Sequence, residues 1–186
     1  MSKLIYIANV SLDGFIEDAH GRLDWTTPSD EVFTFVTDLV RPAGAYLYGR
    51  RMYETMAVWE TDPALAAQSE LRSDFARVWK AANKVVYSTT LPDVSTANTR
   101  LERNFAPDAI RDMKASATKD LTVGGPALAA HAFRAGLIDE CHLLICPVFL
   151  GAGKSSLPRD TRADLELVDE RRFGSGVVYV RYRVAS

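Results

Sequence analysis

Short apolar runs alternate with amphipathic segments along most of this chain, and that order constrains its fold more than any other feature. Strand-like runs occur at residues 3–10, 45–48, 85–87, 121–123 and 141–148. Helical periodicity occurs between them, at residues 30–40, 50–56, 69–82, 107–117 and 126–135. Strands that alternate with helices pair in parallel, so the pattern predicts a parallel sheet covered by helices on both faces.

Two further strand patterns close the chain, at residues 165–173 and 177–184 around Gly174-Ser175-Gly176. The short turn between them predicts an antiparallel hairpin. A weaker strand is expected near residues 99–101. Loops are expected after the first strand, at residues 57–67 and around Gly151-Ala152-Gly153. The sequence therefore predicts an α/β fold with one mixed, mainly parallel sheet, in a single domain spanning residues 1–186.

Composition argues against several classes of function. The formal net charge of −2 provides no basic surface for nucleic acid and no block of like charge for a membrane. No run approaches the ~20 apolar residues of a membrane span, and the N-terminal residues lack the pattern of a signal peptide. The three histidines lack the spacing of metal ligands, so no metal site is expected. We therefore expect a cytoplasmic protein that acts on a small molecule.

Three strand ends carry residues suited to phosphate groups. They are Gly49-Arg50-Arg51, Ser88-Thr89-Thr90, and Gly124-Gly125-Pro126, the last of which opens a helix. Helix N-termini and arginine side chains both bind phosphate, and ligands of open α/β sheets collect beyond the carboxyl ends of the strands. Together the three corners favour a dinucleotide. Each has a simpler interpretation as well: the glycines can serve turn geometry, and the arginines can be an exposed helix start.

The helix at residues 30–40 carries the first candidate for a catalytic acid. Thr27 is expected to cap it, with Pro28 at the first helical position and Asp30 three residues after the cap. Asp30 then has two interpretations. It completes a capping box, or it lies in a largely apolar cleft beside Trp25 and Phe33, where desolvation would favour the protonated carboxyl and assist proton delivery to a substrate ring nitrogen.

Several motifs occur together in this chain. They are Ser11-Leu12-Asp13-Gly14-Phe15-Ile16, Tyr48-Gly49-Arg50-Arg51-Met52-Tyr53-Glu54, Val123-Gly124-Gly125-Pro126, and Gly136-Leu137-Ile138-Asp139-Glu140 with Pro147-Val148-Phe149-Leu150-Gly151. From residue 3 to about residue 184 the chain resembles the dihydrofolate reductase superfamily, in the branch of the C-terminal reductase domain of the bacterial riboflavin biosynthesis protein. The resemblance implies a dihydrofolate reductase-like three-layer αβα fold with a mixed, mainly parallel eight-stranded sheet and an antiparallel C-terminal hairpin.

The resemblance also implies NADPH as the hydride donor. The residues beside the nicotinamide would be Ala8, Gly14, Phe15 and Ile16, and those at the phosphates Gly49, Arg50, Arg51 and Met52, with Arg50 at the 2′-phosphate. Ser88 and Thr89 would lie along the adenosine, and the pyrophosphate would be held by Gly124, Gly125, Pro126, Ala127 and Leu128. The substrate would contact Trp25, Asp30, Phe33 and Tyr53, with Asp30 as the active-site acid.

Two departures from folate-reducing members argue against folate as the substrate. Ala82 stands where those members carry a substrate-binding arginine, and Leu144 replaces a threonine that partners the acid. The prediction is therefore an NADPH-dependent reductase that transfers a hydride to a small pterin- or pyrimidine-like heterocycle. The alternative is a non-catalytic nucleotide-binding protein that retains the fold. A homodimer is expected, because relatives in this branch often pair and the C-terminal strands are expected to expose Val and Tyr in alternation.

Overall fold

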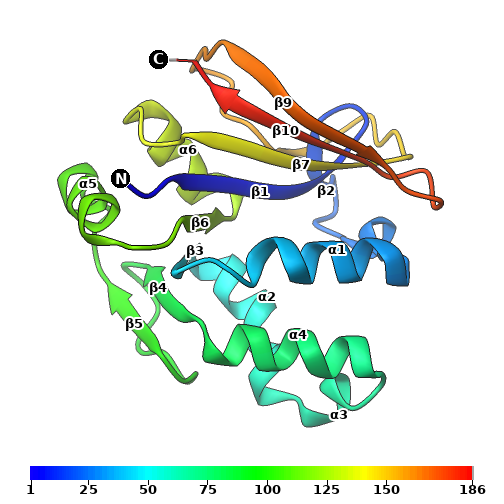
Figure 1. The fold of residues 1–186 in the computed structure, drawn as a ribbon, viewed down its shortest axis with the longest axis horizontal. Helices are drawn as coiled ribbons and strands as arrows, with labels where there is room; N and C mark the ends of the chain where they lie inside the picture. Colours follow the sequence, from blue (N-terminus) through cyan, green and yellow to red (C-terminus); the bar gives the residue numbers. More distant parts are fainter. Residues whose placement is uncertain (186) are drawn as a thin grey trace.

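Eight strands form one continuous sheet in the computed structural model, which describes residues 1–185 (Figure 1). Along the chain they are β1 (Leu4–Ser11), β3 (Ala45–Gly49), β4 (Asn83–Tyr87), β5 (Thr99–Glu102), β6 (Leu121–Gly124), β7 (Glu140–Cys146), β9 (Leu165–Arg172) and β10 (Val178–Val184). Their order across the sheet is β5-β4-β3-β6-β1-β7-β10-β9. The last residue of the predicted domain, Ser186, lies outside the described residues.

Strand direction divides this sheet into a parallel part and an antiparallel edge. All neighbouring strands from β5 to β7 pair in parallel, because the chain returns to the same edge after each of them. At the other end, β10 pairs antiparallel with both β7 and β9, with a bulge between Arg181 and Tyr182. The predicted mixed, mainly parallel eight-stranded sheet and its antiparallel C-terminal hairpin are confirmed.

Helices cover both faces of the sheet (Figure 1). They are α1 (Asp30–Val40), α2 (Arg50–Thr61), α3 (Pro63–Ala66), α4 (Glu70–Ala81), α5 (Pro107–Ser116) and α6 (Pro126–Arg134). Tyr6 and Val123 are buried beneath α5 and α6, on what we call the α5–α6 face. Tyr48, Trp79 and Leu144 are buried on the opposite side, the α1–α4 face. Between residues 1 and 185, no helix has the length and apolar character to cross a membrane.

Two short strands lie in segments where the sequence predicts loops. β2 (Phe15–Asp18) and β8 (Gly153–Ser155) pair antiparallel as a separate two-stranded ribbon. Gly153 permits this pairing, since a Cβ atom there would overlap the backbone carbonyl of Glu17. The loop prediction for both segments is wrong, because strands of three or four residues carry no clear period-2 pattern.

The prediction of a loop at residues 57–67 is also wrong. α2 continues to Thr61, and α3 begins at Pro63 after a cap by Asp62. In the additional turns of α2, Trp59 packs against Phe33 and Phe75, with ring centroids 5.8 and 4.7 Å apart. Tertiary packing of this kind stabilises a helical segment whose own sequence signal is weak.

Ser29, and not Thr27, caps α1. The Ser29 Oγ atom accepts a hydrogen bond from the backbone N–H of Val32 (3.4 Å), whereas the Thr27 hydroxyl donates to the carbonyl of Asp24 (3.0 Å). Asp30 is therefore the first helical residue, and the predicted capping box between Thr27 and Asp30 is wrong. A serine one residue before the helix competes successfully because the preceding turn already uses the threonine.

The C-terminal strands differ in part from the expected alternation of exposed Val and Tyr. Val178 is exposed, and every residue of β9 is exposed as well. Tyr179, however, is buried, with its ring centroid 4.7 Å from that of Phe35 on α1, and Tyr182 is half-buried. An unpaired edge strand next to exposed Val178 is consistent with association, but the homodimer stays a prediction.

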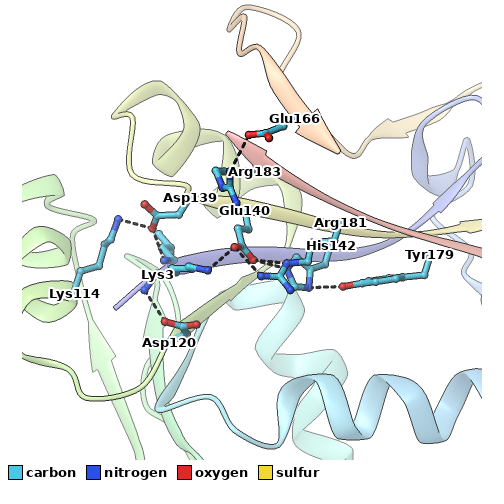
Figure 2. Close-up of polar contacts among 11 residues, drawn as sticks. Lys3, Lys114, Asp120, Asp139, Glu140, His142, Glu166, Tyr179, Arg181 and Arg183 are labelled. Carbon is cyan, nitrogen blue, oxygen red and sulfur yellow. Dashed lines mark hydrogen bonds and ion pairs between the residues drawn. The ribbon is translucent and has the colours of Figure 1, made fainter. Parts of the chain in front are cut away.

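A buried polar cluster joins β1, β7 and β10 near the N-terminal end of β1 (Figure 2). The Glu140 carboxylate accepts hydrogen bonds from Lys3 (2.6 Å), Arg181 (2.9 and 3.0 Å) and His142 (3.0 Å). Burial alone would raise the pKa of Glu140, but its bonds to Arg181, Lys3 and His142 lower it to about 2. Burial lowers the pKa of His142, so its neutral ring donates through Nε2 to Glu140 and accepts at Nδ1 from Tyr179 (3.0 Å).

Replacing Glu140 by Gln is expected to lower the free energy of unfolding by about 3 kcal/mol at pH 7, because it removes the buried carboxylate that pairs with Lys3 and Arg181 and accepts from His142. Urea denaturation measures the loss. Glu166→Gln is the matched control: Glu166 pairs with Arg183 (2.8 Å) at the exposed edge, where ion pairs contribute less than about 1 kcal/mol. Equal losses in the two variants would contradict the role of the cluster.

The same pair of proteins also tests the pKa of Glu140. The folded value of about 2 lies below the ordinary value of 4.5, so the carboxylate stabilises the fold fully above the ordinary value and loses this effect as the pH falls toward 2. The stability difference between the wild type and Glu140→Gln is therefore expected to shrink steadily from about pH 5 downward. A difference independent of pH would show that ionisation of Glu140 is not its source.

Candidate functional site at the carboxyl edge of the sheet

The glycine-bearing strand ends lie together at one edge of the sheet. Tyr48 of β3 is in register with Gly124 of β6, and Gly49 is in register with Tyr87 of β4. The corners that follow these strands are therefore neighbours, as the parallel pairing requires. The start of α2 also approaches the first turn of α6: a Cβ atom on Gly49 would lie 3.8 Å from the Cβ of Leu128.

Two helices begin at these corners without any capping side chain. Gly49 is the N-cap of α2 and Gly125 is the N-cap of α6; neither helix has an acidic residue in its first turn. By contrast, α1 and α4 have serine caps, at Ser29 and Ser69, and acids in their first turns. Uncapped N–H groups and the positive end of the helix dipole attract anions. Two adjacent uncapped helix starts form an electropositive corner suited to phosphate groups.

The glycine pair at the start of α6 has a definite packing reason. Gly125 has a φ angle of +93°, which side-chain-bearing residues rarely adopt, and a Cβ atom there would lie 3.2 Å from the Cβ of Met52. A Cβ atom on Gly124 would lie 3.1 Å from the ring of Tyr48. The simple interpretation of these glycines as geometric is thus correct. It coexists with an open backbone at the helix start, so geometry and anion binding use the same residues.

The two arginines of the β3 corner lie differently. Arg50 Nε donates to Glu54 (2.8 Å) and its Nη1 donates to Thr90 (2.9 Å), which ties α2 to the turn after β4. Arg51 donates to Glu17 of β2 (3.1 Å). Both guanidinium groups are largely exposed, so the interpretation as an exposed helix start is compatible with the structure. Their remaining N–H groups can bind an anion at the same edge.

The hydroxyl groups after β4 serve the turn in which they lie. Ser88 is buried, and its Oγ atom accepts hydrogen bonds from the backbone N–H groups of Thr90 (3.2 Å) and Leu91 (2.9 Å). Thr89 is exposed at the tip of the turn. Of the two residues predicted along an adenosine, Thr89 is therefore the one whose side chain is open to a ligand.

The loop after β1 is held at the same edge by Asp13. The Ser11 hydroxyl donates to Asp13 (2.7 Å), and the carboxylate accepts from the backbone N–H groups of Leu150 (3.2 Å) and Gly151 (2.7 Å). Burial would raise the pKa of Asp13, but these hydrogen bonds lower it below the ordinary value. This arrangement ties the predicted nicotinamide loop, Gly14 to Ile16, to the loop that follows β7.

A polar side chain that sequence reasoning missed lies beside this loop. On β1, Ala8 and Val10 are buried on the α5–α6 face, whereas Asn9 is exposed on the α1–α4 face. β1 is flanked by β6 and β7, and the chain leaves β1 and β6 toward opposite sides, through α1 to β3 and through α6 to β7. Ligands of open α/β sheets bind at such a switch point. One polar residue within the apolar run 4–10 is the signal that could have identified Asn9.

The residues predicted to contact a substrate do not form one site: Phe33 and Tyr53 share a core cluster, Trp25 belongs to another, and Asp30 is exposed. Asp30 is exposed on α1, where it lines a shallow hollow with Phe35 and Arg171 instead of the expected cleft with Trp25 and Phe33. Trp25 packs against the core below α1, and Phe33 packs against Trp59 and Phe75. Tyr53 is buried, and its hydroxyl accepts from the backbone N–H of Ser95 (3.0 Å). Phe33 and Tyr53 therefore belong to the core. Within residues 1–185, no cluster of three potential metal ligands occurs.

Comparisons with known proteins agree with this architecture. YyaP of Bacillus subtilis (strain 168), an uncharacterized protein, is 28% identical over 182 residues, which span 97% of this chain and 94% of YyaP. A Shewanella sp. PV-4 protein named for riboflavin biosynthesis has a TM-score of 0.78 at 20% identity, with 99% of both chains covered. Acinetobacter baumannii RibD has a TM-score of 0.70 at 16% identity; all of this chain matches 59% of that one.

These neighbours confirm the dihydrofolate reductase-like fold expected from the motifs. The family comparison extends over nearly the whole chain, because residues 2–179 match the family described as the RibD C-terminal domain. The glycine corners, the uncapped helix starts and the switch point beside Asn9 all lie inside the matched range. This chain belongs to the RibD C-terminal domain family.

Proposed function

We propose that this protein is an NADPH-dependent reductase of a small pterin- or pyrimidine-like heterocycle. The observation that carries the proposal is the pair of adjacent, uncapped helix starts at Gly49 and Gly125, next to the guanidinium of Arg50. A dinucleotide with a pyrophosphate and a 2′-phosphate matches this arrangement of positive groups. Membership in the RibD C-terminal domain family supports an oxidoreductase activity.

Each part of the carboxyl edge has a role in this proposal. The first N–H groups of α6, from Gly125 to Leu128, bind the pyrophosphate, and Arg50 binds the 2′-phosphate. Thr89 lies along the adenosine, with Ser88 shaping the turn. Ala8 and the loop at residues 14–16 flank the nicotinamide, held in place by Asp13. Bound NADPH supplies the hydride, and the chain binds and orients the two reactants.

Water supplies the proton in this proposal. Asn9 is exposed at the switch point, so solvent reaches the place where the substrate would lie. Asp30 is exposed on α1, and Glu31, Thr34, Phe35, Asp38 and Arg171 line the same shallow hollow. Its position therefore favours water over the carboxyl of Asp30 as the immediate donor.

Titration with NADPH, followed by the fluorescence of the nicotinamide, tests the cofactor assignment directly. Oxidation of NADPH is then measured with a panel of pterins, pyrimidines and quinones. Binding with turnover of one panel member supports the reductase. Binding without any turnover would instead support the non-catalytic nucleotide-binding alternative. Absence of binding at several hundred micromolar NADPH would remove the proposed function.

Replacing Arg50 by Gln is expected to weaken NADPH binding about 10- to 100-fold, the effect of losing a charged hydrogen bond to phosphate, and to leave NADH binding nearly unchanged. Fluorescence titration with both nucleotides measures the difference. Arg41→Gln is the matched control, since Arg41 pairs with Asp74 (2.6 Å) beyond the end of α1, away from the carboxyl edge. An equal loss for NADPH and NADH would contradict the assignment of Arg50 to the 2′-phosphate.

Gly125→Ala and Gly136→Ala separate strain from binding at the two ends of α6. Both glycines have positive φ angles, +93° and +63°, so each variant is expected to lose about 1 kcal/mol of stability or somewhat more. Only Gly125 also approaches Met52, whereas nothing lies within 4 Å of a Cβ atom on Gly136. NADPH affinity is expected to fall at least ~10-fold in Gly125→Ala alone, because the helix start must shift. Similar affinities in both variants would argue against pyrophosphate binding at Gly125.

Asp30→Asn tests the source of the proton. If water is the donor, kcat of the variant is expected to stay within about twofold of the wild type, with the panel compound that the wild type reduces as substrate. Loss of a general acid would lower kcat ~100-fold or more. The pH profile of kcat is measured in parallel, since a general acid must be protonated and would make kcat fall as the pH rises through its pKa, a descending limb that the variant lacks. A large loss together with a missing limb would return the role to Asp30.

A further inference from the structure

The central strand of the sheet is covered on only one of its faces. Toward α5 and α6, the β1 side chains Leu4, Tyr6, Ala8 and Val10 are almost fully buried. Toward α1, Ile5 and Ile7 of the same strand are half-buried, Asn9 is exposed, and Ser11 at the end of the strand is buried again. Inner strands of a parallel sheet are normally buried on both faces. The exposure of Asn9 therefore marks an opening in the helical cover at the carboxyl end of β1.

The surroundings of Asn9 differ on its two sides. On one side its register partner is Leu144 of β7, which is fully buried and packs in the same core as Ile7 and Trp25. On the other side, pairing of β1 with β6 ends at Tyr6 and Val123, so the end of β1 lies beside the corner at Gly124. Asn9 thus lies between the buried side chain of Leu144 and the uncapped start of α6, the proposed site of the cofactor's pyrophosphate.

Other polar side chains on these inner strands are already engaged. His142 bonds to Glu140 and Tyr179, and Ser11 bonds to Asp13. Among residues 1–185, the side-chain amide of Asn9 forms no hydrogen bond with protein atoms, while the strand fixes the position of its backbone. A polar group that lies at an opening and is not used by the fold is suited to a ligand.

The chemistry of the amide specifies the complementary ligand edge. Asn presents one acceptor, the carbonyl oxygen, and a donor group, the NH2, side by side. A cyclic amide (a lactam) presents N–H and C=O in the same spacing, so the two match in a two-bond pair. An amidine edge, as in a 2,4-diamino heterocycle, presents donors on both positions when protonated. Such an edge matches a carboxylate, which only accepts.

We propose that the Asn9 side chain binds the lactam edge of the heterocyclic substrate and selects oxo-heterocycles over diamino-heterocycles. This inference rests on the proposed function and adds the residue that sets its substrate class. β1 is a central strand and lies between β6 and β7. A substitution at position 9 can therefore change the hydrogen-bonding groups of the side chain without changing its shape. Asn9→Asp is nearly isosteric and converts the acceptor–donor pair into acceptors alone.

The experiment measures binding of two probes to the protein saturated with NADP+, which forms the complex without turnover. The probes are lumazine, a pteridine-2,4-dione with lactam edges, and 2,4-diaminopteridine, with an amidine edge. Their intrinsic fluorescence reports the two dissociation constants. The wild type is expected to favour lumazine, and Asn9→Asp is expected to shift the ratio of the two constants toward 2,4-diaminopteridine by about tenfold or more.

Asn98→Asp is the matched control, because Asn98 lies before β5, at the opposite edge of the sheet from the opening. It is expected to leave the ratio unchanged. The NADP+ affinity of each protein is measured first, so that loss of cofactor binding, which would remove the proposed function, is seen separately. With NADP+ bound, an unchanged ratio in Asn9→Asp, or a wild type that binds lumazine no better than 2,4-diaminopteridine, would overturn the inference.

Discussion

Parallel pairing of β1 with β6 and β7 is the constraint on which the rest of this structure depends. It places the ends of β1, β3, β4, β6 and β7 at one edge, and with them every corner discussed above. The direction of β1 is reinforced at its other end by the bonds of Lys3 to Glu140 and of the Leu4 N–H to Asp139 (2.7 Å). The charged cluster around Glu140 therefore stabilises the amino end of β1. It also fixes the direction of this strand, which places Ala8 and Asn9 toward the carboxyl edge of the sheet.

Helix capping differs between the helix starts of this molecule. A serine or aspartate satisfies the first N–H groups of α1, α3 and α4, as Ser29, Asp62 and Ser69 do, whereas α5 begins after Ala106 without a side-chain cap. Where α2 and α6 begin, glycine stands at the same position and leaves those groups free. A serine cap contributes about 1 kcal/mol relative to alanine but only a few tenths relative to glycine, so glycine leaves these N–H groups free at little cost in stability. The free groups would then be available to an anion.

Much of the fold could be predicted from the sequence because its signals are local. Residues 30–40 carry a complete helical face, and the observed α1 has the same limits. Cys141 and Cys146 are buried on opposite faces as free thiols, as alternation along a strand predicts. The segments that were missed depend on distant partners: β2 exists only against β8, and the last turns of α2 are stabilised by Phe33 and Phe75. No window of a single sequence contains those contacts.

The candidate site was predictable to a lesser degree. Its glycine corners were identified because a strand end and a helix start are both visible in sequence, but the exposure of a side chain is not. Asp30 and Asn9 illustrate the two errors that follow. Asp30 looks like an acid in a cleft and lies in solvent, whereas Asn9 looks like one polar interruption in a buried strand and is open.

The bonds of Asp13 to the N–H groups of Leu150 and Gly151 have a thermodynamic consequence for any guest molecule at this edge. The loop after β1 and the loop after β7 are joined to each other in the absence of any ligand. The pairing of β2 with β8 extends this connection. Association then freezes few additional backbone torsions, and little of the contact energy is consumed in ordering the receptor. Ligand binding at this edge of the sheet would therefore need little ordering of the two loops.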